Sequence, residues 1–299
     1  MGISNYPSSV TLPKDNAGCS TVLEFLIKRF PRIKPEIWMQ RIGDGKVQWE
    51  DKTSISEHSP YSPHKRVLYY REVEQEPDIP FSETILYQDD GLLVVDKPHF
   101  MPVIPNGNYV RQSLLYRLRS KTGIDTLTPI HRIDRCTAGI VMFSINPDTR
   151  GLYQMLFANG QVSKTYHAIA NIPTNSDITT QQLPRQWLVE NRIVSGDPWF
   201  RMSVTDGEIN ARTRIKCVAV KGVKGLFHLY PLTGKTHQLR LHMSGLNMPL
   251  LNERYYPELQ PESADDCRKP LQLLAKRLEF IDPIAAETRC FNSLLSLDW

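Results

Sequence analysis

The chain has 299 residues, 40% of them hydrophobic, and a formal net charge of +4, which describes an ordinary globular protein with room for one large domain and an appendage, or for two domains. This small positive excess permits a polyanionic partner without requiring one. The five cysteines form no C-x-x-C pair, so they suggest neither a zinc site nor a disulfide framework and favour a reducing compartment. Because the sequence contains neither a membrane-span pattern nor a secretory leader pattern, we expect a soluble, cytosolic protein.

Residues 20–73 are expected to form a first unit of small helices and short strands. Thr21 and Glu24 stand at the spacing of a capping box, which predicts a short amphipathic helix that ends before Pro31. The other elements expected in this unit are a helix at 35–43 and strands at 46–49 and 66–73.

Basic residues are concentrated in this first unit. Five of them fall within fourteen positions: Lys28, Arg29, Arg32, Lys34 and Arg41. The cluster predicts either an RNA-contacting module or a solvated face, and charge alone does not separate the two.

A stretch rich in Pro and Glu, residues 74–83, is expected to link this unit, residues 1–75, to a main domain, residues 76–299. The main domain should begin with a β-hairpin at 85–98 that turns at Gly91. Helices are expected at 111–123 and 146–160, and strands at 162–170, 212–220, 225–232, 237–243 and 273–280. Many strands with few short helices predict an α+β domain built on a largely antiparallel mixed sheet.

The segment "HRIDRCTAGI", residues 131–140, places Asp134 between Arg132 and Arg135, directly before an apolar run that resembles a buried strand. One interpretation is a salt-bridged loop. The other is a carboxylate held ionised at the floor of a cleft, ready to act as a nucleophile or a base. These ten residues by themselves favour the salt-bridged loop.

The segment "HQLRLHM" is expected to be a strand whose alternation separates His237 from His242, so that the two histidines cannot jointly hold a metal ion. His237 is then expected to be a core histidine with a backbone hydrogen bond. A guanidinium flanked by leucines on a central strand needs a carboxylate or phosphate partner, and Asp134 is the candidate partner of Arg240.

In "SKTYHAIA" the same alternation puts Lys164, Tyr166 and Ala168 on one face of a strand. A phenol beside an ammonium, with a small residue leaving space above, is compatible with a binding site. A tyrosine at a sheet edge with its hydroxyl in water is equally well supported by this segment.

Four motifs together resemble the RluA-type pseudouridine synthases, in order and in spacing, over residues 81–283. "PIHRIDRCTAGIVMFS" is similar to the second family motif, and "ILYQDDGLLVVDKP" to the opening hairpin. "KTYHAIA" is similar to the K-x-Y motif, and "PLTGKTHQLRLHMSGLNMPLLNERYYP" to the segment T-G-R-T-H-Q-I-R-x-H followed by P-x-x-G-D. The first unit resembles a degenerate S4-like RNA-binding module.

The sequence departs from the family pattern at several motif positions, which are Ile133, Ala138, Lys235, Asn252 and Glu253. In addition, the segment "LQLLAKRLEF" lacks a histidine often found before its alanine. These substitutions keep charge or apolar character, so they leave the reaction class intact and bear on substrate choice and loop geometry.

The resemblance implies a pseudouridine synthase fold and the isomerisation of uridines in rRNA or tRNA, which needs no cofactor and no metal. It makes Asp134 the carboxylate that attacks C1′ or stabilises its developing charge, with Arg240 pairing the aspartate and Tyr166 bordering the uracil or acting as a base. The residues expected to bind RNA are His131, Arg132, Arg135, Lys164, Lys235, Lys28, Arg29, Arg32 and Arg41. A monomer is the default expectation.

Two other function classes compete with this interpretation. A hydrolase of N-glycosidic bonds would need a second carboxylate about 5 to 10 Å from Asp134. Asp89, Asp90 and Asp96 in the first hairpin are available for that role. A non-catalytic RNA-binding protein would fit the basic first unit but gives no reason for the acid.

Overall fold

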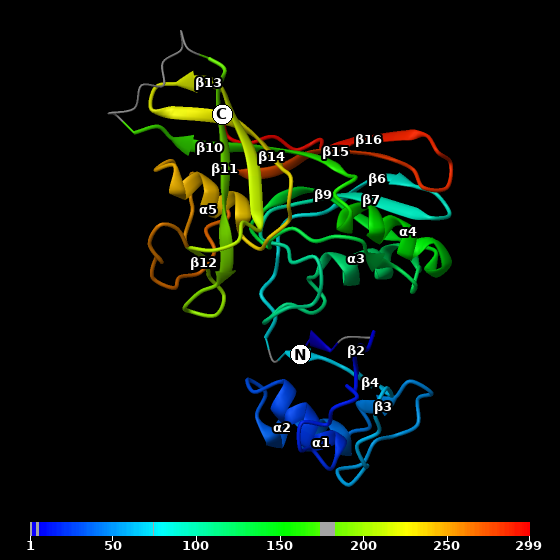
Figure 1. Cartoon of the computed structure of the whole chain (residues 1–299). Helices are drawn as coiled ribbons and strands as arrows, with labels where there is room; N and C mark the ends of the chain where they lie inside the picture. Colours follow the sequence, from blue (N-terminus) through cyan, green and yellow to red (C-terminus); the bar gives the residue numbers. More distant parts are fainter. Residues whose placement is uncertain (1, 4–5, 74, 174–182) are drawn as a thin grey trace. The chain divides into compact units, whose positions relative to one another are not determined.

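The computed structural model describes residues 2–3, 6–73, 75–173 and 183–299. The chain divides into two compact units, one made of Met1–Pro77 with Pro105–Gln112 and the other of Asp78–Ile104 with Ser113–Trp299 (Figure 1). None of the helices in this described part of the chain combines the length and the apolar character that a membrane crossing requires.

The N-terminal unit packs two helices, α1 (Val22–Arg29) and α2 (Pro35–Gly43), around an apolar core that contains the fully buried Trp38. The capping box is confirmed, because Thr21 Oγ1 accepts from Glu24 N at 3.2 Å while the Glu24 carboxylate accepts from Thr21 N at 3.3 Å. A three-stranded antiparallel sheet runs in the order β2 (Ser8–Thr11), β4 (Arg66–Tyr69), β3 (Val47–Trp49). A short pair joins β1 (Gly2–Ile3) to β5 (Glu72–Val73).

The main unit is built on one sheet of eleven strands, ordered β12-β11-β13-β14-β10-β15-β9-β7-β6, with β16 beside β15 and β8 beside β9. The strands are β6 (Thr84–Gln88), β7 (Leu92–Lys97), β8 (Thr128–Pro129), β9 (Ala138–Ser144), β10 (Ser163–Asn171), β11 (Arg185–Ser195), β12 (Met202–Thr205), β13 (Ala211–Lys221), β14 (Lys224–Pro231), β15 (Leu273–Ile281) and β16 (Thr288–Asn292). Among the described strand pairs of this sheet, only β9 with β15 is parallel. The α+β class with a largely antiparallel mixed sheet is therefore confirmed.

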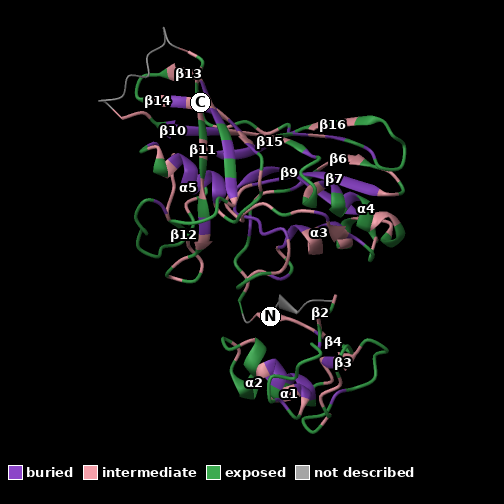
Figure 2. Cartoon of the chain, viewed as in Figure 1, coloured by how far each residue is buried: buried purple, intermediate pink, exposed green. Residues whose placement is uncertain are grey.

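The helices of this unit are α3 (Leu114–Thr122), α4 (Pro147–Ala158) and α5 (Gln238–Gly245). In Figure 1, α3 and α4 lie beside the end of the sheet that contains β7 and β9, and α5 lies beside the end that contains β10 and β14. The predicted helix signals are confirmed: Gly123 ends α3 in the left-handed conformation, and the Asn146 side chain accepts from Asp148 N at the start of α4. Strands β7 and β9 are buried along their whole length (Figure 2), with α4 residues Tyr153 and Leu156 in the same apolar cluster.

The strand expected at 237–243 is wrong, because this segment begins helix α5. Leu239, Met243 and Leu246 follow the helical spacing i, i+4, i+7 and pack against the apolar cluster formed by β10, β13 and β14. A short segment that alternates Leu with polar residues satisfies both periods, and the packing surface decides between them. Strands β1, β2, β8, β11, β12 and β16 lie in segments for which no element was predicted.

Gly139 is essential to the junction between β9 and β15. Its backbone has φ +109°, and a Cβ at this position would lie 2.3 Å from the carbonyl oxygen of Ala275. Only glycine allows β15 to approach β9 this closely. The segment that carries Asp134 ends at this junction, so its last residues are fixed by the sheet.

Candidate active site

Asp134 lies in the loop between β8 and β9, and its side chain is 29% exposed. A buried lysine, Lys97, holds this loop through a hydrogen bond to its backbone. Lys97, at the end of β7, donates from Nζ to the carbonyl oxygens of Pro98 at 2.9 Å, Met101 at 2.8 Å and Arg135 at 3.2 Å. All three donors of the ammonium are thus used, while burial lowers the pKa of Lys97 to about 7.

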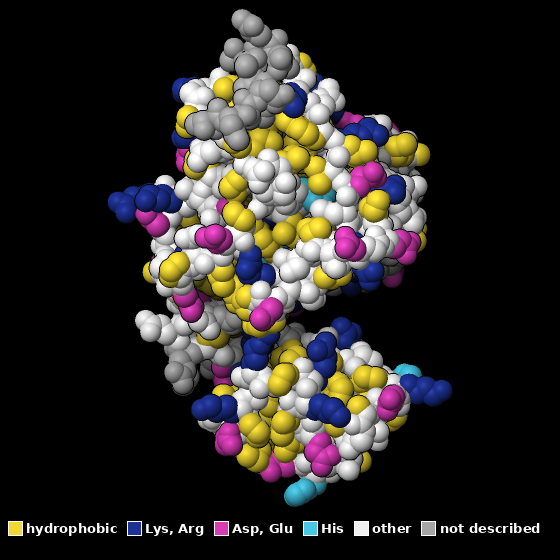
Figure 3. Space-filling model, turned by 60° about the vertical axis from the view of Figure 1, so that its left-hand side comes forward, with side chains coloured by type: hydrophobic (Ala, Val, Ile, Leu, Met, Phe, Trp, Pro, Cys, Tyr) yellow, Lys and Arg dark blue, Asp and Glu magenta, His cyan; other side chains and the backbone are white. Residues whose placement is uncertain are grey.

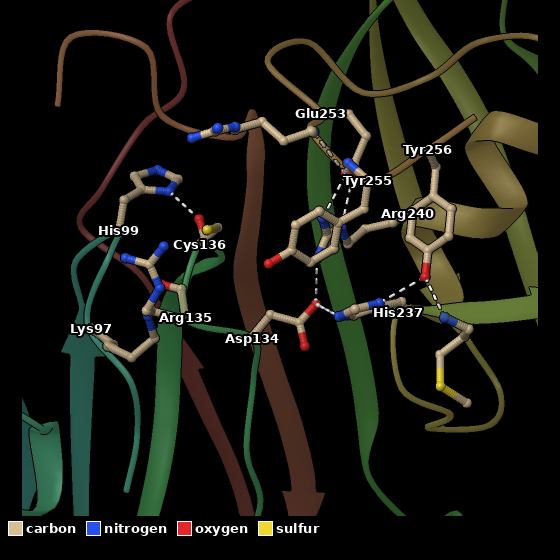
Figure 4. A network of polar contacts seen from close by, with 12 residues as sticks. Lys97, His99, Asp134, Arg135, Cys136, His237, Arg240, Glu253, Tyr255 and Tyr256 are labelled. Carbon is tan, nitrogen blue, oxygen red and sulfur yellow. Dashed lines mark hydrogen bonds and ion pairs between the residues drawn. The ribbon is translucent and has the colours of Figure 1, made fainter. Parts of the chain in front are cut away.

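Arg240 projects from α5 towards Asp134, and Nη1 lies 3.4 Å from Asp134 Oδ2 (Figure 4). The pairing expected from the sequence is present, although on a helix. The closer partner is Glu253, whose carboxylate accepts from Arg240 Nε at 2.7 Å and from Nη2 at 2.5 Å. Burial by itself would lower the pKa of Arg240, but the hydrogen bonds and charge of Glu253 outweigh it and raise that pKa above its ordinary value.

Glu253 is a site residue that sequence reasoning missed. Its side chain is only 1% exposed, and it also accepts from the backbone N–H groups of Arg254 and Tyr255. Every strong contact of this carboxylate therefore serves to hold Arg240 and the following loop. The signal was available: a buried arginine needs a carboxylate, and Glu253 stands where the family segment P-x-x-G-D has its aspartate.

Two tyrosines that follow Glu253 enclose the guanidinium. The Cζ atom of Arg240 lies 4.6 Å from the ring centroid of Tyr255 and 5.6 Å from that of Tyr256. Such contacts favour a cation in a desolvated place. Arg240 is thus held by a carboxylate and two aromatic rings, and only Nη1 is directed at Asp134.

His237 is the residue that precedes α5, and the prediction of a backbone-bonded core histidine is wrong. Its Nδ1 lies 2.8 Å from Tyr256 Oη, and its Nε2 lies 3.8 Å from Asp134 Oδ2 (Figure 4). Burial lowers the pKa of His237, and the charge of Asp134 offsets this only in part. His242 is separate from it, since its ring nitrogens meet Thr213 and Asn191.

Tyr166 and Lys164 both lie on β10, two residues apart, which is the spacing at which alternation predicts a common face. Tyr166 is partly buried against the cluster that contains Ala168. Burial, and after it the charge of Asp134, raises the pKa of Tyr166 above its ordinary value. Lys164 has a pKa lowered by burial. It lines a groove of about 600 Å³ together with Arg214 and Lys216, and none of the described residues that line this groove is acidic.

The residues around the aspartate differ in how accessible they are. His131 accepts from the Met142 N–H at 3.1 Å and stacks on Phe157 with ring centroids 4.5 Å apart. Burial, with a smaller contribution from Lys164, lowers the pKa of His131 to about 3, so the ring is neutral. The ring of His131 is thus engaged with Met142 and Phe157, and it has no charge that would attract a phosphate.

The two arginines that flank Asp134 also differ. Arg135 makes a bidentate pair with Asp265, at 2.6 and 3.0 Å, so its guanidinium already has a protein carboxylate. Arg132 is exposed, and so is Lys235 in the loop before α5. These two side chains remain accessible to a ligand.

The basic residues of the N-terminal unit fall into two groups. Arg41 is buried, lies 3.9 Å from Glu72 and covers the Trp38 ring at 5.1 Å, so it is a core cation and does not suit RNA contact. Lys28, Arg29 and Arg32 are exposed. In Figure 3 several Lys and Arg side chains lie on the visible face of this unit, among hydrophobic ones.

The acids of the first hairpin have other partners. Asp96 is buried and accepts from Ser293 Oγ and Leu294 N. Asp89 accepts from Tyr87 Oη and from the turn at Gly91. Asp90 is exposed. Within the described ranges, no group of three or more His, Cys, Asp or Glu side chains could hold a metal ion.

Comparison with known proteins agrees with this geometry. The model of the RNA pseudouridylate synthase family matches residues 91–245, more than half of the chain. The dual-specificity RNA pseudouridine synthase RluA of Haemophilus influenzae is 32% identical over 228 residues, which are 74% of this chain and 97% of that protein. The tRNA pseudouridine synthase C of Pasteurella multocida is 31% identical over 213 residues, which are 68% of this chain and 87% of that protein.

A solved structure of similar fold also carries the pseudouridylate synthase name. The human RNA pseudouridylate synthase domain containing 4 superposes with a TM-score of 0.54 and 26% identity, covering 71% of this chain and 88% of that one. The class is therefore that of the RNA-modifying isomerases. Within it, the chain belongs to the RluA-type RNA pseudouridine synthases.

Proposed function

We propose that Asp134 is the catalytic carboxylate and that it acts on a uridine of rRNA or tRNA that has left its stack. The observation that carries the proposal is a difference in exposure between the two side chains. The Arg240 side chain is 5% exposed and is held by Glu253, whereas the Asp134 side chain is 29% exposed. Arg240 Nη1 donates to Asp134 Oδ2 at 3.4 Å. A buried, fixed cation next to an accessible carboxylate provides a positioned nucleophile.

The chemistry needs nothing beyond protein side chains. The bond from C1′ to N1 breaks, the uracil turns, and a bond from C1′ to C5 forms; N1 gains a proton and C5 loses one, so atoms and electrons balance without a cofactor. Asp134 either bonds to C1′ or stabilises the positive charge that develops there, as carboxylates do in glycoside hydrolysis. Arg240 Nη1, 3.4 Å from Oδ2, orients the aspartate.

Tyr166 is proposed to border the uracil. Its raised pKa means that the phenol stays protonated at neutral pH, which suits packing and hydrogen-bond donation better than proton abstraction. Arg132 is proposed to fill the gap left by the flipped base or to hold a phosphate. Lys235 and Lys164, the latter with its basic groove, are proposed to contact the RNA backbone.

The first unit, residues 1–75, is proposed to be an S4-like RNA-binding module that joins the catalytic domain of residues 76–299. Support comes from Lys28, Arg29 and Arg32, which are exposed on or just after α1. Arg41 is left out because it is buried beside Glu72.

The decisive test is Asp134→Asn in the full chain, with Asp125→Asn at an exposed position as the matched control. RNA labelled with tritium at uridine C5 should release its label to water with the control and with the unchanged protein. Asp134→Asn should lose this activity while keeping fold and RNA affinity, because the amide is nearly isosteric but a poor nucleophile. Substantial activity of Asp134→Asn would refute the assignment.

Product analysis separates the competing functions. A pseudouridine synthase forms pseudouridine and liberates no uracil, while an N-glycosidic hydrolase releases uracil. A non-catalytic binder does neither.

The target remains to be located by mapping pseudouridine across total RNA with and without the protein. Uridines that lose the modification only in its absence are the substrates. We expect them in rRNA or tRNA, and we expect a monomer in the cytoplasm; sedimentation and fractionation test the last two points.

A further inference from the structure

Three residues form a line of polar contacts that ends on the proposed catalytic carboxylate. The backbone N–H of Met202 donates to Tyr256 Oη at 2.8 Å, and Tyr256 Oη lies 2.8 Å from His237 Nδ1. On the far side of the ring, His237 Nε2 lies 3.8 Å from Asp134 Oδ2. Figure 4 shows the imidazole directly between the tyrosine hydroxyl and the carboxylate.

The contacts of Tyr256 determine which nitrogen of His237 carries the proton. Tyr256 is buried, and its oxygen already accepts the Met202 N–H. The remaining hydroxyl hydrogen needs an acceptor, and the acceptor within reach is His237 Nδ1. A neutral ring that accepts at Nδ1 carries its proton on Nε2, the nitrogen that faces Asp134.

The backbone of His237 supports a role for this ring orientation. His237 has φ +54°, the left-handed conformation that residues other than glycine rarely adopt, and its side chain makes no capping hydrogen bond to α5. Strain of this kind persists only where the surrounding structure requires it. In this case the strained conformation directs the ring at Asp134 instead of at the helix start.

The guanidinium of Arg240 and the imidazole of His237 approach the same carboxylate oxygen of Asp134. Arg240 Nη1 at 3.4 Å and His237 Nε2 at 3.8 Å both approach Oδ2. No hydrogen bond to Asp134 Oδ1 is found among the described residues. The two contacts therefore leave Oδ1 available to a substrate atom.

We propose that His237, aligned by Tyr256, is a positioning residue of the reaction: its Nε2–H orients Asp134 through Oδ2 so that Oδ1 faces C1′ of the uridine. The inference rests on the proposed function, in which Asp134 is the catalytic carboxylate. The distance of 3.8 Å shortens to a hydrogen bond when substrate excludes water from the site.

The direct measurement is the tautomer of His237 in the full chain, read from ¹⁵N shifts of labelled histidine at neutral pH. The Nε2–H form is expected in the unchanged protein, and Tyr256→Phe should lower its population because the donor to Nδ1 is lost. An Nδ1–H form in the unchanged protein would overturn the proposal. The measurement on the unchanged protein is independent of activity and requires no variant, and the comparison with Tyr256→Phe is made once that variant is shown to be folded.

Kinetics provide the second measurement. His237→Leu should lower kcat by roughly 10- to 100-fold with little change in KM, because misorienting a reacting group affects the chemical step. His237→Gln, whose amide nitrogen can occupy the place of Nε2, should recover much of that loss. Tyr256→Phe should lower kcat in the otherwise unchanged protein. It should have no further effect in His237→Gln, since the imidazole that Tyr256 aligns is already absent there.

The control is His228→Gln on β14, away from these contacts, which should leave kcat unchanged. A folded His237→Leu variant with unchanged kcat would overturn the inference. If Asp134→Asn is inactive while His237→Leu is fully active, only this inference fails. If Asp134→Asn is active, the proposed function fails first.

Discussion

The charged residues around Asp134 and those on and just after α1 lie in opposite environments. Around Asp134 the cation of Arg240 and the anion of Glu253 are both withdrawn from water and paired through two short hydrogen bonds. In the N-terminal unit Lys28, Arg29 and Arg32 are exposed to solvent. Interactions between charges are several-fold stronger when water is excluded and are weakened by salt when it is not. Buried charges are therefore suited to positioning atoms, and exposed charges to contacting a polyanion.

The largest effect of a single conservative change is expected at Arg240. Arg240→Lys removes the two-pronged contact with Glu253 and leaves that carboxylate buried without its planar partner. We expect kcat to fall by about 100-fold or more as Asp134 loses its orientation. The free energy of unfolding should fall by about 3 kcal/mol, as for other broken buried pairs.

Tritium release and urea unfolding provide the two measurements. The matched control is Arg212→Lys, which loosens an exposed pair with Glu190 and should change stability by less than about 1 kcal/mol. Near-normal turnover in Arg240→Lys would show that the buried charge pair is not what positions the aspartate.

Gly139 tests whether the sheet itself holds the site. In Gly139→Ala the new methyl group would collide with the backbone of Ala275, so β9 and β15 must separate. We expect a loss of about 3 kcal/mol in unfolding free energy and a lower kcat, since this junction follows the Asp134 loop. Gly151→Ala, in the exposed part of α4 where nothing lies within 4 Å, should instead be neutral or stabilising. Equal behaviour of the two variants would contradict the argument.

Much of the fold could be predicted because its local signals are strong. The capping box at Thr21, the N-cap at Asn146 and the left-handed Gly123 each satisfy backbone groups within a few residues, so their effect can be read in the sequence. The pairing of Asp134 with Arg240 was also predictable, because a buried guanidinium demands an acid and the family motifs place the two together.

The parts that were missed depend on contacts between distant segments. Helix α5 and a strand fit the same alternating residues, and only the surface against which Leu239 and Met243 pack selects the helix. The contact from Tyr256 through His237 to Asp134 depends on how the loop after α5 returns over the site. Arg41 was misplaced among the RNA ligands because charge in a sequence does not reveal burial.

The pH dependence of stability should reveal His131 as a partly buried, neutral histidine. Its pKa in the native state is about 3, below the roughly 6.5 of an unfolded chain, so between these values only the unfolded chain binds the proton. Its contribution to stability is complete above pH 6.5 and is lost as pH falls, by about 3 kcal/mol at pH 4.

Urea unfolding at pH 7 and pH 4 measures this effect. His131→Gln keeps an acceptor for the Met142 N–H but removes the titratable ring. The free energy of unfolding of this variant should therefore fall less between pH 7 and pH 4 than that of the unchanged protein. His58→Gln, at an exposed position, is the control and should follow the unchanged protein. His167 and His242, whose pKa values burial lowers to about 4, still contribute in every variant. An unchanged pH dependence in His131→Gln would mean that this ring is solvated.

The smallest effect is expected from the exposed charges of the first unit, and substitution tests them more cleanly than deletion. The segment Pro105–Gln112 belongs to this unit, and the carboxylate of Glu76 accepts from the N–H groups of Val110 and Gln112. A chain that begins at Pro77 would leave those groups without their partner. Changes in the full chain avoid this defect.

Replacing the three exposed cations near α1 by glutamine should weaken RNA binding without affecting the chemical step. Three lost phosphate contacts would reduce the slope of log affinity against log salt by about 2, and KM should rise while kcat stays constant, because the contacts act equally on ground and transition states. The variant combines Lys28→Gln, Arg29→Gln and Arg32→Gln. Its control has the same net charge and combines Lys14→Gln, Lys52→Gln and Lys65→Gln at other exposed positions of the unit. If the two variants have the same affinity and salt slope, the first unit attracts RNA through net charge alone; if neither differs from the unchanged protein, it does not bind RNA at all.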